Sequence, residues 1–133
     1  MVDANVLLDV MTSDPAWGAW SGERIEQLAD SCTLVINQAI YAEVSVGFER
    51  IEDLESALPE TYVTRESIPW EAAFLAAKCF VNYRRRGGLR SSPLPDFFIG
   101  AHALVRGMRL LTRDAARYRT YFPRLELIAP PGA

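Results

Sequence analysis

Residues 108–130, MRLLTRDAARYRTYFPRLELIAP, contain the alternation that decides the fold. The apolar run at 108–113 predicts a strand, residues 114–122 predict a helix, and residues 125–130 predict a second strand. Two strands joined by a helix usually lie parallel in one sheet, and the helix forms a right-handed crossover on its face. This segment therefore predicts an α/β arrangement.

The same alternation runs back to the start of the chain. Further strands are predicted at the N-terminus, ending at Asp3, and at 32–37 and 61–67. Helices are predicted from Asn5 and at 14–30, 38–48, 51–58 and 70–86. Another is predicted within 91–107, with Pro95 at its first position and Gly107 just past its end. Short apolar strands that alternate with helices predict an α/β fold with a short parallel β-sheet flanked by α-helices on both faces.

The ends of the predicted strands are the first places to look for a site, because ligands of such sheets bind beyond the carboxyl ends of the strands.

The first strand is short in this sequence. Only Met1 and Val2 precede Asp3, whereas a typical strand has about five or six residues. Either the native chain begins upstream of Met1 or this strand is unusually short.

Length and composition indicate a globular protein. The chain has 133 residues, of which 50% are hydrophobic and 23% charged, so we expect one domain over residues 1–133 with a proper core. No stretch approaches the roughly 18 apolar residues of a membrane span, and the N-terminus lacks a basic region typical of a signal peptide. Cys32 and Cys79 have no CxxC spacing and are predicted to be reduced core residues of a cytoplasmic protein.

Charge is distributed unevenly along the chain. Residues 1–83 hold fourteen acidic and four basic side chains, whereas residues 84–133 hold ten arginines and three acids. This segregation favours a basic surface that binds a polyanion. A compositional bias of the genome is the alternative, because thirteen of the fourteen basic residues are arginine. Such a bias explains the choice of arginine better than it explains the segregation.

Three of the candidate acids have an ordinary structural explanation when each is taken alone. Asp3 and Asp114 follow predicted strands, and Asp96 follows Pro95 at a predicted helix start. A carboxylate at these places can cap a helix or interact favourably with its dipole. Thr112 could compete with Asp114 for the capping role.

Glu43 is different, because the residues three and four positions away from it in the predicted helix are all apolar or small. None can pair with a carboxylate, and a partly buried carboxylate is costly unless it is protonated or meets a cation. Taken together, the four acids are expected to meet at one edge of the sheet. Their natural partner there is a hard divalent cation, Mg²⁺ or Mn²⁺, which can activate water for attack on a phosphodiester.

Four segments resemble, in order, the motifs of PIN-domain ribonucleases, and in particular of the VapC toxins of bacterial toxin–antitoxin pairs. The segments are VDANVLLDV, INQAIYAEV, LPDFFIGAHALVRGMRLLTRD and YFPRLELIAP. The resemblance covers essentially the whole chain. It implies a PIN-like fold and a metal-dependent endoribonuclease that hydrolyses RNA, with transfer RNA as one candidate. It also implies a cognate VapB-like antitoxin and a homodimer.

The resemblance also implies which residues form the site. The family acids fall on Asp3, Glu43, Asp96 and Asp114, which would hold Mg²⁺ or Mn²⁺. The hydroxyl residue of the last motif falls on Thr112, and Asn5 matches the polar residue two places after the first acid. We count all six as candidate catalytic residues.

Arginines near these motifs are candidates for substrate binding, because guanidinium groups make bidentate contacts with phosphates. They are Arg113, beside two of the candidate site residues, and Arg84, Arg85, Arg86 and Arg90. The alternative for the last four is a solvated helix C-terminus, where arginines suit the helix dipole. His102 could act as a general base, but the sequence around it favours a helix-packing or surface role.

Other functions compete with the ribonuclease hypothesis. A phosphoaspartyl phosphatase would need an aspartate where Asn5 stands, and a receiver domain would need a lysine after a late strand, whereas Lys78 lies within a predicted helix. Both fit poorly. A non-catalytic PIN-like interaction module is a third alternative; loss of an acid would be its signature, and all four acids are present. A nuclease of the same fold that acts on DNA stays open, because phosphate contacts carry no base identity.

Overall fold

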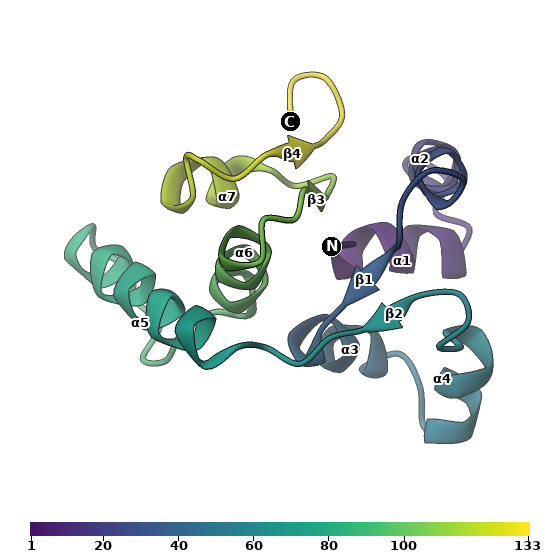
Figure 1. Cartoon of the computed structure of the whole chain (residues 1–133), viewed down its shortest axis with the longest axis horizontal. Coiled ribbons are helices and arrows are strands. Elements are labelled where there is room, and N and C mark those ends of the chain that lie inside the picture. The colour runs from purple at the N-terminus through teal and green to yellow at the C-terminus, as the bar shows by residue number, and fades with distance from the viewer.

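The computed structural model describes residues 1–133 as seven helices and four short strands (Figure 1). The helices are α1 (Ala4–Met11), α2 (Gly18–Ala29), α3 (Gln38–Ser45), α4 (Ile51–Ala57), α5 (Trp70–Arg85), α6 (Pro95–Val105) and α7 (Ala116–Tyr121). The strands are β1 (Val35–Ile36), β2 (Thr64–Arg65), β3 (Leu110–Leu111) and β4 (Leu127–Ile128). None of the helices combines the length and the apolar character that a membrane crossing requires.

The strands pair in parallel, and the N-terminal residues join them into one layer. β1 pairs with β2, and β3 pairs with β4. Between the pairs, the amide of Val2 donates to the carbonyl of Val35 at 2.9 Å. On the other side, Leu111 donates to Met1 and accepts from Asp3, both at 2.9 Å. The order across the layer is therefore β2, β1, the N-terminal segment (residues 1–3), β3 and β4.

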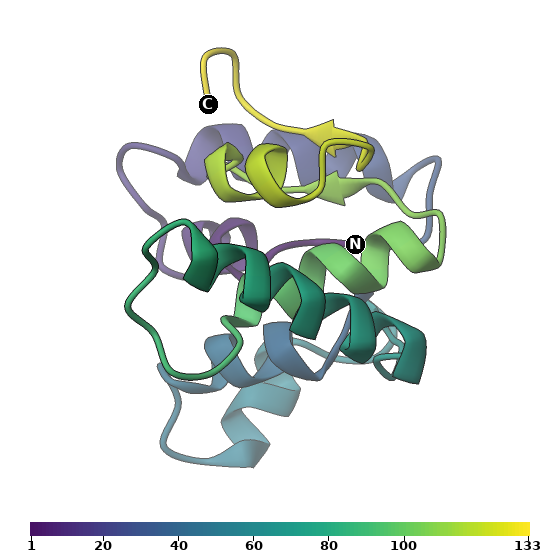
Figure 2. The same cartoon turned by 90° about the vertical axis from the view of Figure 1, so that its left-hand side faces the viewer.

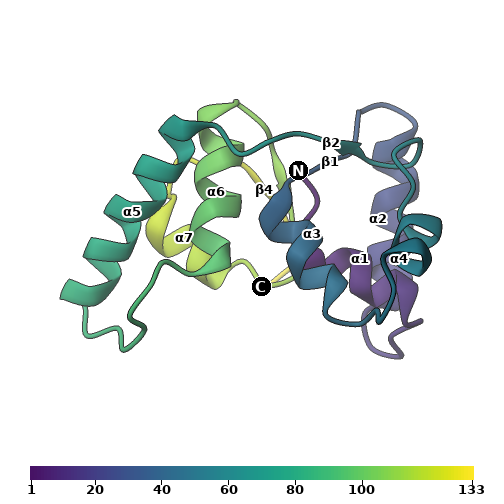
Figure 3. The ribbon, with the colours of Figure 1, turned by 90° about the horizontal axis from the view of Figure 1, so that it is seen from below.

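Helices cover both sides of this layer, as the sequence predicted. Figures 1 and 3 show α5, α6 and α7 on one side of the strands and α1, α2 and α4 on the other, with α3 between the two groups. Figure 2 views the molecule from the α5 side, where α5 lies in front of α6. The predicted α/β class with a short parallel sheet is confirmed, although each strand is shorter than its apolar run.

Close packing on α6 positions the N-terminus of this helix. The helix is buried along most of its length, including Phe97 and Ile99. The ring of Phe97 packs against Tyr121 of α7 with centroids 5.1 Å apart. A Cβ on Gly100 would come within 2.5 Å of the Phe122 ring, so only glycine permits this approach of α6 to the end of α7.

Helix ends follow the sequence signals at some places and depart from them at others. Pro95 opens α6, and Gly107 follows its end with a φ of +67°, as predicted. The helix expected from residue 14 begins only at Gly18, because the Asp14 carboxylate closes a turn by accepting from the amides of Ala16 and Trp17.

Candidate active site

Asp3 stands where the N-terminal segment meets α1, and it is 3% exposed. Its Oδ1 accepts a hydrogen bond from the amide of Ala4 at 2.8 Å, so the predicted helix cap is confirmed. Its Oδ2 accepts from the hydroxyls of Thr112 at 2.8 Å and Tyr118 at 3.0 Å, and from the Asn5 amide at 3.4 Å. The cap and the contacts to the rest of the site therefore use different oxygens of one carboxylate.

Asp96 lies next to Asp3 through a shared partner on α7. Its Oδ1 is 3.3 Å from the Tyr118 hydroxyl, the same group that contacts Asp3. Its Oδ2 accepts from Nη1 of Arg117 at 3.1 Å in a partly exposed ion pair. One short helix thus contacts both oxygens of the Asp96 carboxylate.

Glu43 reaches the same region from α3. Its Oε1 is buried and has no hydrogen-bond partner. Burial, followed by repulsion from Asp3 and Asp96, raises the pKa of Glu43 to about 7. This mutual repulsion indicates that acids from three separate segments of the chain lie within electrostatic reach of one another.

The electrostatics of these three carboxylates fit a cation. Burial raises the pKa of Asp3 to about 6 against the lowering effect of the Thr112 hydrogen bond, and repulsion from Asp96 raises it further. In this arrangement, no three His, Cys, Asp or Glu side chains converge closely enough to ligate one ion. The oxygen donors and the unpaired Glu43 Oε1 nevertheless suit a hard divalent cation, which would draw the carboxylates together.

Thr112 and Asn5 connect the end of β3 to the start of α1. The Thr112 hydroxyl is buried, donates to Asp3, and accepts from the Asn5 amide at 3.2 Å. The side-chain oxygen of Asn5 in turn accepts from the backbone amide of Arg113 at 3.3 Å. Together they fix the orientation of the Asp3 carboxylate.

A comparison with protein-family models places this chain in a known family. The sequence model of the PIN-domain family matches residues 1–123 of this chain. The chain belongs to the PIN-domain family. Among curated proteins, no sequence matches it significantly.

Several solved structures have the same fold as this PIN domain. A chain of VapBC2 from Rickettsia felis, in a complex bound to a DNA fragment from its promoter, has a TM-score of 0.75 at 18% identity, with 98% of this chain and 97% of that chain covered. A chain of VapBC-1 from nontypeable Haemophilus influenzae has a TM-score of 0.71 at 22% identity, with 97% and 96% covered. A chain of FitAcB from Neisseria gonorrhoeae has a TM-score of 0.68 at 14% identity, with 96% and 94% covered. At these identities the likeness establishes a shared fold.

Asp114, the fourth acid predicted for this PIN domain, is connected to the site only through its backbone, which contacts Thr112. Its carboxylate is exposed and accepts no hydrogen bond, and it is not among the charges that raise the pKa of Asp3 or Glu43. The capping role expected for Asp114 is wrong, because α7 begins after Ala115 without a side-chain cap. The Thr112 hydroxyl instead accepts the Asp114 amide at 3.2 Å.

Arg113 is held by a buried acid that sequence reasoning did not single out. Its Nε donates to Oδ2 of Asp9 at 2.8 Å, and Asp9 is 2% exposed. Ser21 donates to the same oxygen at 2.8 Å, and the guanidinium carbon lies 5.9 Å from the centroid of the Trp17 ring. The hydrogen bond to Asp9 raises the pKa of the Arg113 guanidinium. The Nε group of Arg113 therefore stabilises the fold through its hydrogen bond to Asp9.

The other four arginines surround the exposed end of α5. Arg84 folds back and donates to the carbonyl of Arg90 at 2.9 Å. The guanidinium of Arg86 lies 5.6 Å from the centroid of the Tyr121 ring. All four, including Arg85, are exposed, and none pairs with a carboxylate. They are free to contact a polyanion.

His102 lies outside the acid site. It is fully buried, with Nδ1 3.1 Å from Nδ2 of Asn37 and Nε2 3.3 Å from Oε1 of Glu66. Burial lowers the pKa of His102. The packing role predicted for His102 is confirmed.

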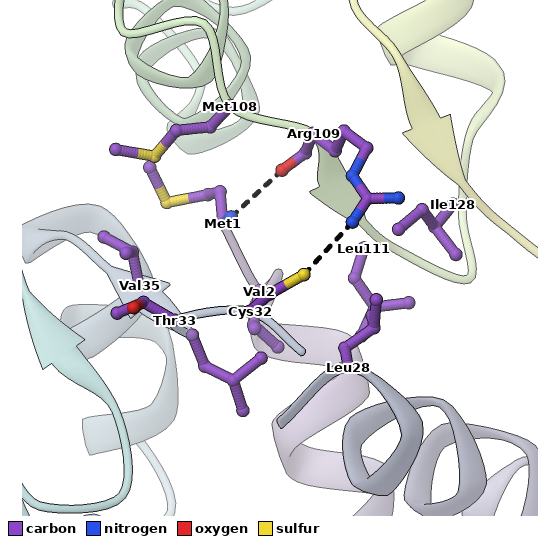
Figure 4. A pocket seen from close by; sticks show the side chains of 11 residues that line it. Met1, Val2, Leu28, Cys32, Thr33, Val35, Met108, Arg109, Leu111 and Ile128 are labelled. Atoms are coloured by element: carbon purple, nitrogen blue, oxygen red, sulfur yellow. Dashed lines mark hydrogen bonds between the residues drawn. The ribbon is translucent and has the colours of Figure 1, made fainter. Parts of the chain in front are cut away.

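A separate pocket of about 190 Å³ lies beside Met1 and contains none of the four acids (Figure 4). The Met1 ammonium donates to the Arg109 carbonyl at 3.0 Å, and Nη2 of Arg109 donates to Sγ of Cys32 at 3.3 Å.

Both cysteines are free, as expected. The core location predicted for both is right for Cys79 and wrong for Cys32, which is exposed.

Sequence reasoning missed the two residues that α7 contributes to the acid site, Arg117 and Tyr118. A weak signal existed, since Tyr118 stands one helical turn after Asp114, on a helix expected to begin near the acids. That spacing does not reveal which face of the helix points toward the acids. The orientation of the helix is known only from the tertiary structure.

Proposed function

We propose that this PIN domain is a cytoplasmic, metal-dependent endoribonuclease toxin of the VapC type. The observation that carries the proposal is the gathering of Asp3, Glu43 and Asp96 from three separate segments, with Oε1 of Glu43 buried and unpaired. Carboxylates that repel one another destabilise the fold when no cation is bound. The same clustered carboxylates are the ligands that a divalent cation requires.

Asp3 and Asp96 are the main candidates to hold Mg²⁺ or Mn²⁺. Glu43 and Asp114 would complete the site through waters or a second ion. When bound, the cation supplies activation of a water and stabilisation of the departing oxygen. Thr112 and Asn5 keep the Asp3 carboxylate oriented by their hydrogen bonds.

Phosphate binding is assigned to the arginines. Asp9 anchors Arg113 through Nε, which leaves its terminal nitrogens for a phosphate. The exposed arginines at the end of α5, Arg84, Arg85, Arg86 and Arg90, extend a basic surface for the rest of an RNA chain. These phosphate contacts suit any nucleic acid. The choice of RNA, with transfer RNA as one candidate, rests on the resemblance of the sequence motifs to those of PIN-domain ribonucleases.

A cognate antitoxin of the VapB type is the proposed inhibitor. The similar structures include two VapBC assemblies and a toxin–antitoxin complex from Klebsiella pneumoniae, which supports an equivalent partner here. We expect a small open reading frame for a DNA-binding antitoxin beside the gene. Its product should form a stable complex with this chain and suppress cleavage.

We further propose a homodimer through the outer face of α5. Trp70, Phe74, Ala77 and Val81 are exposed at helical spacing, with Trp70 90% and Phe74 66% exposed. In an antiparallel pairing with α5 of a second copy, the Glu71 end of one helix would meet the arginine end of the other, so the charges are complementary. Sedimentation of the Phe74→Glu variant, expected to be monomeric beside a dimeric parent, tests this interface.

The activity test is incubation of the purified chain with total RNA, transfer RNA and single-stranded DNA. We expect cleavage of RNA with Mg²⁺ or Mn²⁺, and none with chelator or in the Asp96→Asn variant. Cleavage of DNA alone would favour the DNA nuclease. No cleavage of any substrate by a chain that also fails to bind the cation would favour a non-catalytic module.

A further inference from the structure

The hydroxyl of Tyr118 stands between the two principal acids. It lies 3.0 Å from Oδ2 of Asp3 and 3.3 Å from Oδ1 of Asp96, and the residue is 1% exposed. A phenol carries a single proton, so it can donate to only one of these oxygens at a time. It presents a lone pair to the other, which is an unfavourable contact for a carboxylate.

A core role needs only the hydrogen bond to Asp3, which satisfies both the phenol and a buried carboxylate oxygen. The second contact, to Asp96, places the same oxygen against another carboxylate and is not needed for packing. The contact does constrain both acids, because the ring is enclosed and Arg117 holds the other oxygen of Asp96 at 3.1 Å. α7 thus supports the pair from the side of the core.

We propose that Tyr118 is a positioning residue for the cation site, an inference that rests on the metal-dependent function proposed above. Its hydroxyl sets the spacing and orientation of the Asp3 and Asp96 carboxylates, so that a divalent cation meets two acids already turned toward it. Tyr118 acts through these acids and does not contact the RNA.

The first test compares Mn²⁺ affinity in the parent and in Tyr118→Phe, by calorimetry in the absence of RNA. Groups that orient metal ligands typically change the affinity by about 10–100-fold when they are removed. We expect the variant to bind Mn²⁺ about tenfold more weakly while keeping its fold, judged by circular dichroism. An affinity within threefold of the parent, or a tighter one, would overturn the proposal, and any larger loss supports it.

Tyr121→Phe is the matched control. Tyr121 lies on the same helix, and its ring packs on Phe97, but its hydroxyl makes no hydrogen bond to the protein. The same atom is removed without a contact to either acid, so Mn²⁺ affinity should stay at the parental value. An equal loss in both variants would trace the effect to the packing of α7 and overturn the assignment.

A second measurement uses the unmodified chain and does not depend on the variant folding. The five tyrosines are labelled with ¹³C at Cζ, and Mg²⁺ is titrated in during NMR. The Tyr118 resonance should move and saturate with the calorimetric affinity. A Tyr118 resonance that stays still while Mg²⁺ binds would overturn the proposal. If the parent binds neither Mg²⁺ nor Mn²⁺, the metal-dependent function itself fails, which is a distinguishable result.

Discussion

The Thr112 hydroxyl donates a 2.8 Å hydrogen bond to Oδ2 of Asp3 across 109 positions of sequence. Both groups are buried, and the bond links the end of β3 to the N-terminal segment beside it. The orientation of the first acid is therefore set by the last third of the chain, and perturbing Thr112 should be felt at Asp3.

Replacing Thr112 by valine keeps the shape of the side chain and removes this donor. Asp3 then loses a short hydrogen bond in a buried setting, and we expect a loss of about 1–3 kcal/mol in the free energy of unfolding, measured with urea. Thr112→Ser retains the hydroxyl and should lose less. If valine and serine are equally destabilising, the hydroxyl is not the cause.

Asp96→Asn is the cleanest test of the proposed chemistry. The side chain is 30% exposed, so the fold should tolerate a neutral amide of the same size. We expect the cleavage rate to fall at least about 100-fold, with loss of growth arrest when the variant is expressed. Asp3→Asn should do the same, at a larger cost in stability because three donors converge on Oδ2. Full activity of a folded Asp96→Asn protein would remove Asp96 from the site.

Glu43→Gln should change how stability depends on pH. The pKa of Glu43 is about 7 in the folded chain, whereas an unfolded glutamate titrates near 4.3, so the folded state binds more protons between about pH 4 and pH 7. The contribution of Glu43 to stability therefore falls as the pH rises through that window.

In metal-free buffer, the glutamine variant should match the parent near pH 4 and melt at a higher temperature at pH 8. Saturating Mg²⁺ should reverse this order at pH 8, because only the parent gains the third carboxylate. Thermal melts across this pH range, with and without Mg²⁺, provide the measurement. A variant that is no more stable than the metal-free parent at pH 8 would contradict the buried, unpaired state of Glu43.

Arg113→Ala separates the scaffold role of this arginine from its role toward RNA. It leaves the buried Asp9 carboxylate with Ser21 as its only side-chain donor. We expect a loss of about 2–3 kcal/mol, below the value for a fully buried pair because Arg113 is 31% exposed. Arg85→Ala, at an exposed position, should change the free energy of unfolding by less than about 0.5 kcal/mol. Weaker RNA binding by Arg113→Ala at unchanged stability would assign the guanidinium to the substrate alone.

The sequence was sufficient for the class of fold and for most helices. Alternating apolar runs predicted the parallel strands, and Pro95 and Gly107 marked the limits of α6 because each acts through local backbone chemistry. Strand lengths were overestimated, since apolar character continues past the last ladder hydrogen bond. The start of α2 was misplaced because the Asp14 carboxylate could close either a helix or a turn.

Residues of the candidate site could be predicted from the sequence where they met one of two criteria. They follow a predicted strand, or they are carboxylates with no partner three or four residues away in their own helix. Asp3 and Glu43 met these criteria, and Asp96 was a candidate because it follows Pro95 at a predicted helix start. Tyr118 and the Asp9–Arg113 pair met neither, because their contacts depend on how α7 and α1 pack against the rest of the chain. Such contacts between distant segments leave no periodic trace in the sequence.

The N-terminal segment forms the middle of the strand layer, yet both of its neighbours come later in the chain, and β3 comes near the end. A nascent chain on the ribosome therefore has no assembled site until β3 and α7 have been synthesised and released. A chain cut short before β3 would lack Thr112 and Tyr118, whose hydroxyls both donate to Oδ2 of Asp3. Completion of the candidate site therefore waits until the last third of the chain has been made.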